Sequence, residues 1–408
     1  MNILFAITGI AFALFVAFLF SFDRKNIDFK KTLIMIFIQV LIVLFMMNTT
    51  IGLTILTALG SFFEGLINVS KAGINFVFGD IQNKNGFTFF LNVLLPLVFI
   101  SVLIGIFNYI KVLPFIIKYV GIAINKITRM GRLESYFAIS TAMFGQPEVY
   151  LTIKDIIPKL SRAKLYTIAT SGMSAVSMAM LGSYMQMIEP KFVVTAVMLN
   201  IFSALIIASV INPYKSDDTD VEIDNLTKST ETKTLNGKTG KPKKVAFFQM
   251  IGDSAMDGFK IAVVVAVMLL AFISLMEAIN ILFGSVGLNF RQLIGYVFAP
   301  IAFLMGIPWS EAVPAPAGSL MATKLITNEF VAMLDFKNVL GDVSARTQGI
   351  ISVYLVSFAN FGTVGIIVGS IKGISDKQGE KVASFAMRLL LGSTLASIIS
   401  GSIIGLVL

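Results

Sequence analysis

Long uncharged apolar segments follow one another along this chain. A helix needs about 20 residues to cross the hydrocarbon core of a bilayer, and several of these segments reach that length. We therefore predict an all-α polytopic membrane protein with about eight transmembrane helices. The expected spans are residues 3–21, 32–50, 88–110, 166–187, 192–212, 259–283, 347–370 and 386–408.

Two further apolar segments are interrupted by glycine and proline. Residues 135–160 contain Gly145-Gln146-Pro147-Glu148, and residues 298–325 contain Gly306-Ile307-Pro308. One such break is more often a kink or a loop. Two breaks that enter from opposite faces instead predict a pair of opposed re-entrant hairpins, which is the usual sequence sign of a binding site in an inverted repeat.

Basic residues lie mostly in the short stretches between apolar segments. The chain has 32 Lys and Arg residues and a formal net charge of +9. With the N-terminus outside, 25 of these residues fall on the inside, as the positive-inside rule requires. We therefore expect both termini outside and no nucleic-acid partner, since the basic excess is topological. Residues 215–244, with seven lysines and six acidic residues, are predicted to form a charged cytoplasmic linker.

The overall composition narrows the chemistry. Apolar residues make up 56% of the chain, charged residues 13%, and the mean hydropathy is +0.86, which argues against a soluble enzyme. The chain contains no cysteine and no histidine. Disulfides, thiolate chemistry and Cys/His metal sites are thereby excluded, and any proton transfer falls to carboxylates, lysine or tyrosine.

Carboxylates inside apolar segments are functional candidates, because a charge at membrane depth is costly unless it is paired or hydrated. Glu148 lies at the first interruption and Glu329 follows the second. Either could instead cap a broken helix. Glu189 is expected to be an interfacial charge, and Glu311 fits an interfacial or a functional role equally well. Downstream, Asn360 and Thr363 are three residues apart and so share one helix face.

These motifs together resemble the concentrative nucleoside transporter family, in particular its bacterial nucleoside permease branch. The resemblance covers about residues 140–365 by motif, and the number of expected spans fits the whole chain. The matching motifs are Gly145-Gln146-Pro147-Glu148, the run from Ser171 to Tyr184, Gly306-Ile307-Pro308-Trp309-Ser310-Glu311-Ala312, Asn328-Glu329-Phe330-Val331-Ala332 and Phe358-Ala359-Asn360.

The resemblance implies a symporter that imports nucleosides across the bacterial cytoplasmic membrane by an elevator-like movement, with a uridine-like substrate. It also implies a homotrimer in the lipid bilayer, in which a scaffold holds a mobile transport domain in each protomer. The implied contacts are Gly145, Gln146 and Glu148 at the nucleobase, Glu329, Asn360 and Thr363 at the ribose, and Phe358 and Met180 as apolar walls.

The expected coupling ion follows from positions at which this chain differs from the sodium-coupled members of the family that it resembles. Sodium-coupled relatives have an asparagine where this chain has Thr141 and a hydroxyl where it has Ala175. A degenerate sodium site is therefore expected near Thr141, Phe144, Ala175 and Val176. We predict proton symport, with Glu148 or Glu329 as the proton carrier and no organic cofactor. Sodium coupling remains the alternative. Pro147 replaces a common threonine, and Thr363 replaces a common serine.

The transporter interpretation has two competitors from other functional classes. An intramembrane enzyme is disfavoured because no ordered nucleophile–base pair or paired-aspartate motif is present. Concentrative uptake of a solute would distinguish a symporter from a channel or a membrane scaffold.

The chain is expected to divide into five parts. These are a mainly scaffold region (1–110), a first transport half (111–214), the linker (215–244), an interfacial helix with a scaffold span (245–290) and a second transport half (291–408).

Overall fold

The computed structural model is helical in all the regular elements that it describes, which confirms the all-α class. The predicted linker, Pro147 and Pro314 lie outside the described residues. The description covers residues 2–79, 88–146, 148–154, 156–214, 246–285, 287, 289–313 and 316–408.

Six helices of the described chain are long and apolar enough to cross a membrane. Five of them coincide with expected spans, and the expected span at 3–21 is the shorter helix α1 (Asn2–Leu19). The six are α2 (Phe29–Asn48), α3 (Thr50–Phe78), the π-helical turn η3 (Phe90–Leu94) continued by α4 (Pro96–Tyr109), α10 (Pro190–Ile211), α12 (Phe247–Gly284) and α20 (Ala386–Ile404).

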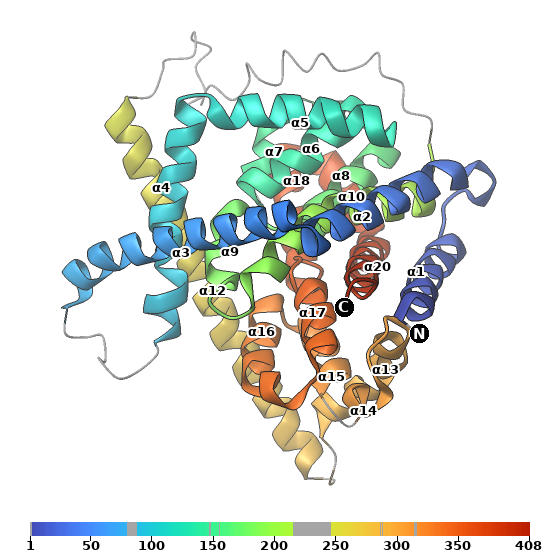
Figure 1. Cartoon of the computed structure of the whole chain (residues 1–408). Coiled ribbons are helices and arrows are strands. Elements are labelled where there is room, and N and C mark those ends of the chain that lie inside the picture. The colour runs from blue at the N-terminus through green and yellow to red at the C-terminus, as the bar shows by residue number, and fades with distance from the viewer. Residues whose placement is uncertain are drawn as a thin grey trace.

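Helix α3 is the long apolar helix that the sequence did not single out as a span. In Figure 1 it continues the direction of α2 and runs crosswise to α4. Phe62, Val69 and Phe76 are exposed on it, and Glu64 and Lys71 lie on the same helix. The uncharged segment that begins at Thr32 runs on to Phe63, but only one span, at 32–50, was assigned to it, and Glu64 and Lys71 interrupt the rest of α3.

Two expected spans, 166–187 and 347–370, are not continuous helices. The first divides into α8 (Arg162–Ser174) and α9 (Met178–Tyr184), and the second into α17 (Ala345–Leu355) and α18 (Phe361–Ile374). Helix α18 restarts because the Asn360 side chain accepts a hydrogen bond from the backbone N–H of Thr363 at 2.8 Å. The prediction of two uninterrupted spans is therefore wrong, since flanking apolar residues conceal both breaks.

The same order of elements occurs twice. A helix–break–helix unit, a broken helix and a long helix follow one another in each half. In Figure 1 the first helix–break–helix unit lies toward the top and the second toward the bottom, so the two units lie at opposite ends of the molecule. The first set is α6 (Arg132–Phe144), α7 (Glu148–Thr152), α8, α9 and α10, and the second is α15 (Pro316–Ile326), α16 (Glu329–Val339), α17, α18 and α20.

The second break lies further along the chain than expected. The range 298–325 holds the end of α13 (Phe290–Leu304), all of α14 (Trp309–Ala312) and most of α15, and α13 packs along α15. Gly306, with φ of +99°, lies in the turn that follows α13. The break that carries Glu329 follows α15, where the Asn328 side chain accepts from the N–H of Val331 at 3.0 Å and starts α16.

Helix packing separates two groups. Helices α1 and α2 pack against α20 and α10, whereas α4 packs along α12. Between the groups and around them lie shorter elements that connect the spans. These are η1 (Arg24–Asn26), α5 (Val112–Thr128), η4 (Ile157–Lys159), η6 (Leu340–Asp342) and α19 (Asp376–Ser384).

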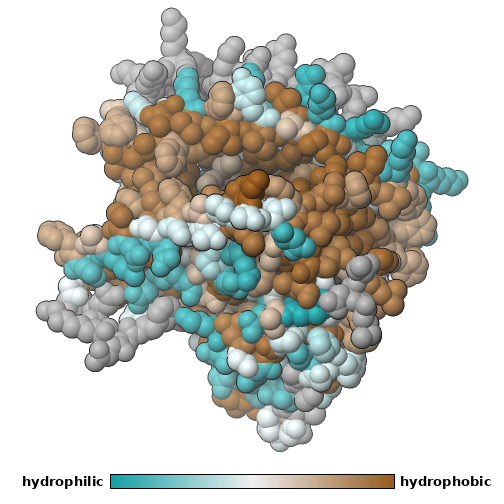
Figure 2. Space-filling view, in the orientation of Figure 1, coloured by the Kyte–Doolittle hydropathy of each residue, from teal (hydrophilic) through white to brown (hydrophobic). Residues whose placement is uncertain are grey.

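Large apolar side chains cover much of the outer surface. Figure 2 shows a broad brown area over the middle and upper parts of one face, with teal atoms at the lower end and along the left and upper right edges. Exposed apolar residues occur along α2, α5 and α12, including Phe37, Phe115 and Leu270. Such an extensive apolar surface is unfavourable in water and is suited to lipid.

Candidate functional site

The first break brings two chain interruptions into direct contact. Gly145 follows α6 with φ of +81°, and its N–H donates to the Thr141 carbonyl at 2.9 Å. A Cβ atom at this position would lie 2.6 Å from the Cβ of Ser177, in the break of α8–α9. Glycine is therefore required both by the backbone conformation and by the close approach. The neighbouring Gln146 side chain donates through Nε2 to the Gly172 carbonyl.

Several buried polar atoms beside this break have no hydrogen-bond partner among the described residues. They are Glu148 Oε2, Tyr150 Oη, Ser171 Oγ and Ser174 Oγ. Tyr150 Oη lies against Gly172, on the same side as the Gln146 amide. Buried polar groups are costly when unsatisfied, so this cluster is suited to take hydrogen bonds from a polar ligand or water.

The second break is held by a continuous hydrogen-bond network around Glu329, which is only 4% exposed. Its Oε1 accepts from Tyr184 Oη at 2.9 Å, and its Oε2 accepts from Asn360 Nδ2 at 3.1 Å. Asn360 Oδ1 in turn accepts from the backbone N–H of Thr363 at 2.8 Å and from Thr363 Oγ1 at 3.0 Å. Three predicted residues are thus brought together at one point.

Aromatic side chains enclose this network. The Phe330 ring lies 5.0 Å from the Tyr184 ring and 6.0 Å from the Phe89 ring, both in edge-to-face geometry. Met180 precedes Tyr184 by one turn of α9 and is buried. Phe358 is partly buried in the break of α17–α18. These apolar surfaces exclude water from the carboxylate's surroundings.

Two residues of this region were missed as site residues by the sequence reasoning. Tyr184 reaches Glu329 from the first half of the chain, although the two are far apart in sequence. Lys324 was counted among the basic residues outside, but its side chain is buried, with 1% exposure. A lysine within an apolar segment, one turn before Asn328-Glu329, was the available signal for the second.

The two clusters approach one another through their helices. Helix α7, which begins at Glu148, packs against α18, which follows Asn360. Among the described residues, no hydrogen bond joins Gln146 or Glu148 directly to the Glu329 network. The predicted site residues therefore form two groups, with Tyr184 as the bridge between the halves.

The expected sodium position lies at the C-terminal ends of α6 and α8. The Thr141 hydroxyl donates to the Phe137 carbonyl at 2.7 Å, so it is already bonded within its own helix. Ala175 and Val176 are buried and offer no side-chain oxygen, and Phe144 is partly buried at the end of α6. Among the four expected residues, only Thr141 offers a cation a side-chain oxygen in addition to the backbone carbonyls.

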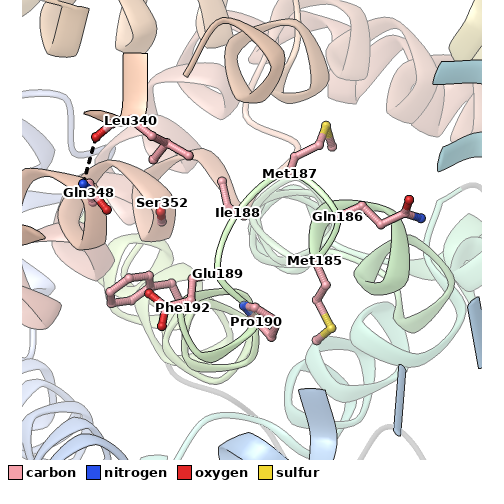
Figure 3. A pocket seen from close by; sticks show the side chains of 10 residues that line it. All are labelled: Met185, Gln186, Met187, Ile188, Glu189, Pro190, Phe192, Leu340, Gln348 and Ser352. Carbon is pink, nitrogen blue, oxygen red and sulfur yellow. Dashed lines mark hydrogen bonds between the residues drawn. The ribbon is translucent and has the colours of Figure 1, made fainter. Parts of the chain in front are cut away.

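A cavity of about 230 Å³ lies between the α9–α10 connection and α17. Figure 3 shows that its walls come from the α9–α10 connection, with Met185 directly after Tyr184, and from Gln348 and Ser352 of α17. Gln348 Nε2 donates to the Leu340 carbonyl at 2.9 Å across one edge. None of the predicted site residues lines this cavity, so it is separate from both clusters.

Comparisons with known proteins identify the family. Residues 192–405 match the Na+ dependent nucleoside transporter C-terminus, residues 8–81 its N-terminus, and residues 90–191 the Gate domain described as nucleoside recognition. The purine nucleoside transport protein NupG of Bacillus subtilis is 34% identical, over 100% of this chain and 99% of the relative. The putative nucleoside permease NupX of Escherichia coli is 30% identical, over 99% of each chain.

A solved structure agrees with the described fold. CNTnw in an inward-facing, substrate-bound state matches with a TM-score of 0.90 and 28% identity, over 100% of this chain and 99% of that one. CNTnw variants are also known in outward-facing and intermediate states. The chain belongs to the concentrative nucleoside transporter family, as the motifs predict. It is a membrane transporter and not an enzyme.

Proposed function

We propose that this transporter imports nucleosides by proton symport, with the ribose bound at Glu329, Asn360 and Thr363. The observation that carries the proposal is the buried Glu329 carboxylate, held by Tyr184 from one half and Asn360 from the other. A carboxylate beside an amide and a hydroxyl can accept from, and donate to, adjacent sugar hydroxyls. Helix breaks at the centre of a repeat are where transporters of this kind place substrate.

The nucleobase is assigned to the first break. Gln146 presents an amide, and Glu148 Oε2 and Tyr150 Oη are buried without partners there. A pyrimidine or purine edge supplies donors and acceptors in one plane, which matches this mixture of groups. Met180 and Phe358 would contact the apolar faces of the ligand.

Glu148 is the better of the two proton-carrier candidates. Both oxygens of Glu329 already accept hydrogen bonds, so that side chain has a fixed role in the network. Glu148 Oε2 has no described partner and is free to take up a proton or a substrate hydrogen bond. The lack of a side-chain oxygen at Ala175 supports protons over sodium, and sodium coupling is the alternative that the experiment must test.

Movement is assigned by packing. We infer that the scaffold lies mainly in residues 1–110 together with α12, which packs along α4, and that the helices around both breaks move against it. Helices α1 and α2 contact α20 and α10 across the boundary between the two parts. We further propose a homotrimer in the bacterial cytoplasmic membrane with both termini outside.

Uptake of labelled uridine into proteoliposomes, under a proton or a sodium gradient imposed separately, tests the proposal. Proton symport predicts accumulation under the proton gradient and its loss with a protonophore. Accumulation driven only by sodium would replace proton coupling with the alternative. Equilibration without accumulation under either gradient would contradict symport.

A competition panel of unlabelled nucleosides defines the substrate. Uridine-like pyrimidines are the expected substrates, and the relative from Bacillus subtilis is named for purine nucleosides. Inosine, guanosine, uridine and cytidine would be compared at equal concentrations. Free bases and ribose should compete poorly, because each engages only one of the two breaks.

A further inference from the structure

The buried Lys324 interacts electrostatically with Glu329 and also has a set of hydrogen bonds that the proposed transport site does not use. Its ammonium donates to the Tyr354 carbonyl, to Ser357 Oγ at 2.7 Å and to Ser397 Oγ at 3.1 Å. It also lies 4.3 Å from the centroid of the Tyr354 ring. The three oxygen acceptors take up the three N–H bonds of the ammonium.

These acceptors come from three different segments in the second half of the chain. Tyr354 is in the last turn of α17, Ser357 is in the break before α18, and Ser397 is on α20. Lys324 itself is in the last turn of α15. Carbonyls at the C-terminal end of a helix lack helical donors and favour positive charge, so a cation here stabilises the ends of α15 and α17 together.

We propose that Lys324 acts as a tethered cation, that is, a positive charge attached covalently to the chain at the second break. Its ammonium occupies an oxygen-lined position, as a bound metal ion would. It thereby holds the backbone of the break in the conformation in which the Asn360 side chain reaches Glu329. Lys324 is a positioning residue in this proposal, which rests on the proposed ribose site. The corresponding helix ends of the first half are α6 and α8, where the sequence predicts a degenerate sodium site. One half would thus carry its cation covalently, and only the other could respond to an ion gradient.

The contacts around Ser357 explain how the charge would act at a distance. Ser357 Oγ also lies 2.7 Å from Ser397 Oγ, and Asn200 Nδ2 donates to the Val356 carbonyl beside it. The backbone from Tyr354 to Ser357 is therefore held from several sides. Asn360 lies three residues after Ser357, and its N–H donates to the Phe358 carbonyl at 2.9 Å. Loss of the ammonium would release the start of this segment.

Chemical rescue of Lys324→Ala tests the proposal in the full-length protein in proteoliposomes. The variant lacks the three methylenes and the ammonium, which n-propylammonium replaces. We expect nucleoside counterflow, measured without a proton gradient because permeant amines would dissipate one, to fall about 10- to 100-fold, since several hydrogen bonds to a charged group are lost. Added n-propylammonium should restore it substantially, methylammonium less, and tetramethylammonium, which has no N–H, not at all. Lys372→Ala, at an exposed lysine of α18, is the matched control and should transport normally with or without amines.

The outcomes separate this inference from the proposed function. Absence of nucleoside uptake by the wild-type protein would contradict the proposed function. Normal uptake by Lys324→Ala, or a folded variant whose defect no amine relieves, would overturn the tethered-cation role. If Lys324→Ala is aggregated in size-exclusion chromatography, Ser357→Ala combined with Ser397→Ala decides: we expect at least about a tenfold loss of uptake, and wild-type uptake would overturn the proposal.

Discussion

The two helix breaks have the same order of elements but differ in how their polar groups are satisfied. At the second break, both oxygens of Glu329 accept hydrogen bonds, and the side chains of Asn360 and Lys324 are hydrogen-bonded as well. At the first break, Glu148 Oε2 and Tyr150 Oη are buried without described partners. The second half is preorganised, whereas the first leaves hydrogen-bonding capacity for a ligand.

This difference assigns separate tasks to the two halves. A preorganised cluster binds without first having to order its own side chains, which lowers the cost of association. An unsatisfied cluster gains more from a ligand, because its polar groups are otherwise unpaired. According to the proposed function, the second break binds the sugar, and the first break binds the base and takes up the proton.

Removing the charge at the centre of the second break should have the largest effect. Glu329→Gln replaces an oxygen that accepts from Asn360 or Tyr184 with a donor, so two donors would face one another. We expect uridine uptake to fall at least about 100-fold, from the loss of hydrogen bonds to a charged group. Glu277→Gln, at an exposed glutamate of α12, is the control and should transport normally. Normal uptake by Glu329→Gln would remove this carboxylate from the site.

A matched pair of tyrosine substitutions compares the two breaks directly. Tyr184→Phe removes a donor to Glu329, whereas Tyr150→Phe removes a hydroxyl with no described partner. Without nucleoside, we expect Tyr184→Phe to destabilise the protein by about 1.5–3 kcal/mol, and Tyr150→Phe to be neutral or stabilising. Thermal unfolding in detergent measures both. Equal destabilisation by the two substitutions would mean that the first break is as fully satisfied as the second.

A smaller effect is expected from the hydroxyl at the edge of the Glu329 network. Thr363→Val keeps the shape and removes the hydrogen bond to Asn360 Oδ1, for which we expect about a 5- to 10-fold loss of uptake. Thr363→Ser keeps the hydroxyl and should transport well. The control is Thr394→Val, because the Thr394 hydroxyl donates only to the Leu390 carbonyl of its own helix. If Thr363→Val and Thr394→Val behave alike, Thr363 does not act through its hydroxyl.

The sequence predicted the features that depend only on residues close together in the chain. Apolar length identified most of the long helices, and charge inside apolar segments identified Glu148 and Glu329. The breaks in α8–α9 and α17–α18 were missed because alanine, valine and phenylalanine keep the hydropathy high through them. Tyr184 and Lys324 were missed because their roles depend on contacts between distant segments. The Tyr184–Glu329 bond has no short-range pattern, and the local sign of Lys324 is only its place within an apolar segment.

The central claim is that the sugar and the base are read by different breaks, and a cycle of variants against ligands tests it most directly. Inhibition constants for uridine, 3′-deoxyuridine and a base-modified uridine would be measured by competition against labelled uridine, using wild type, Asn360→Ala and Gln146→Ala. Asn360→Ala is predicted to abolish the difference between uridine and 3′-deoxyuridine and to keep the penalty for the modified base, and Gln146→Ala to do the reverse. If both variants change discrimination at the sugar and the base equally, the division between the two breaks is wrong.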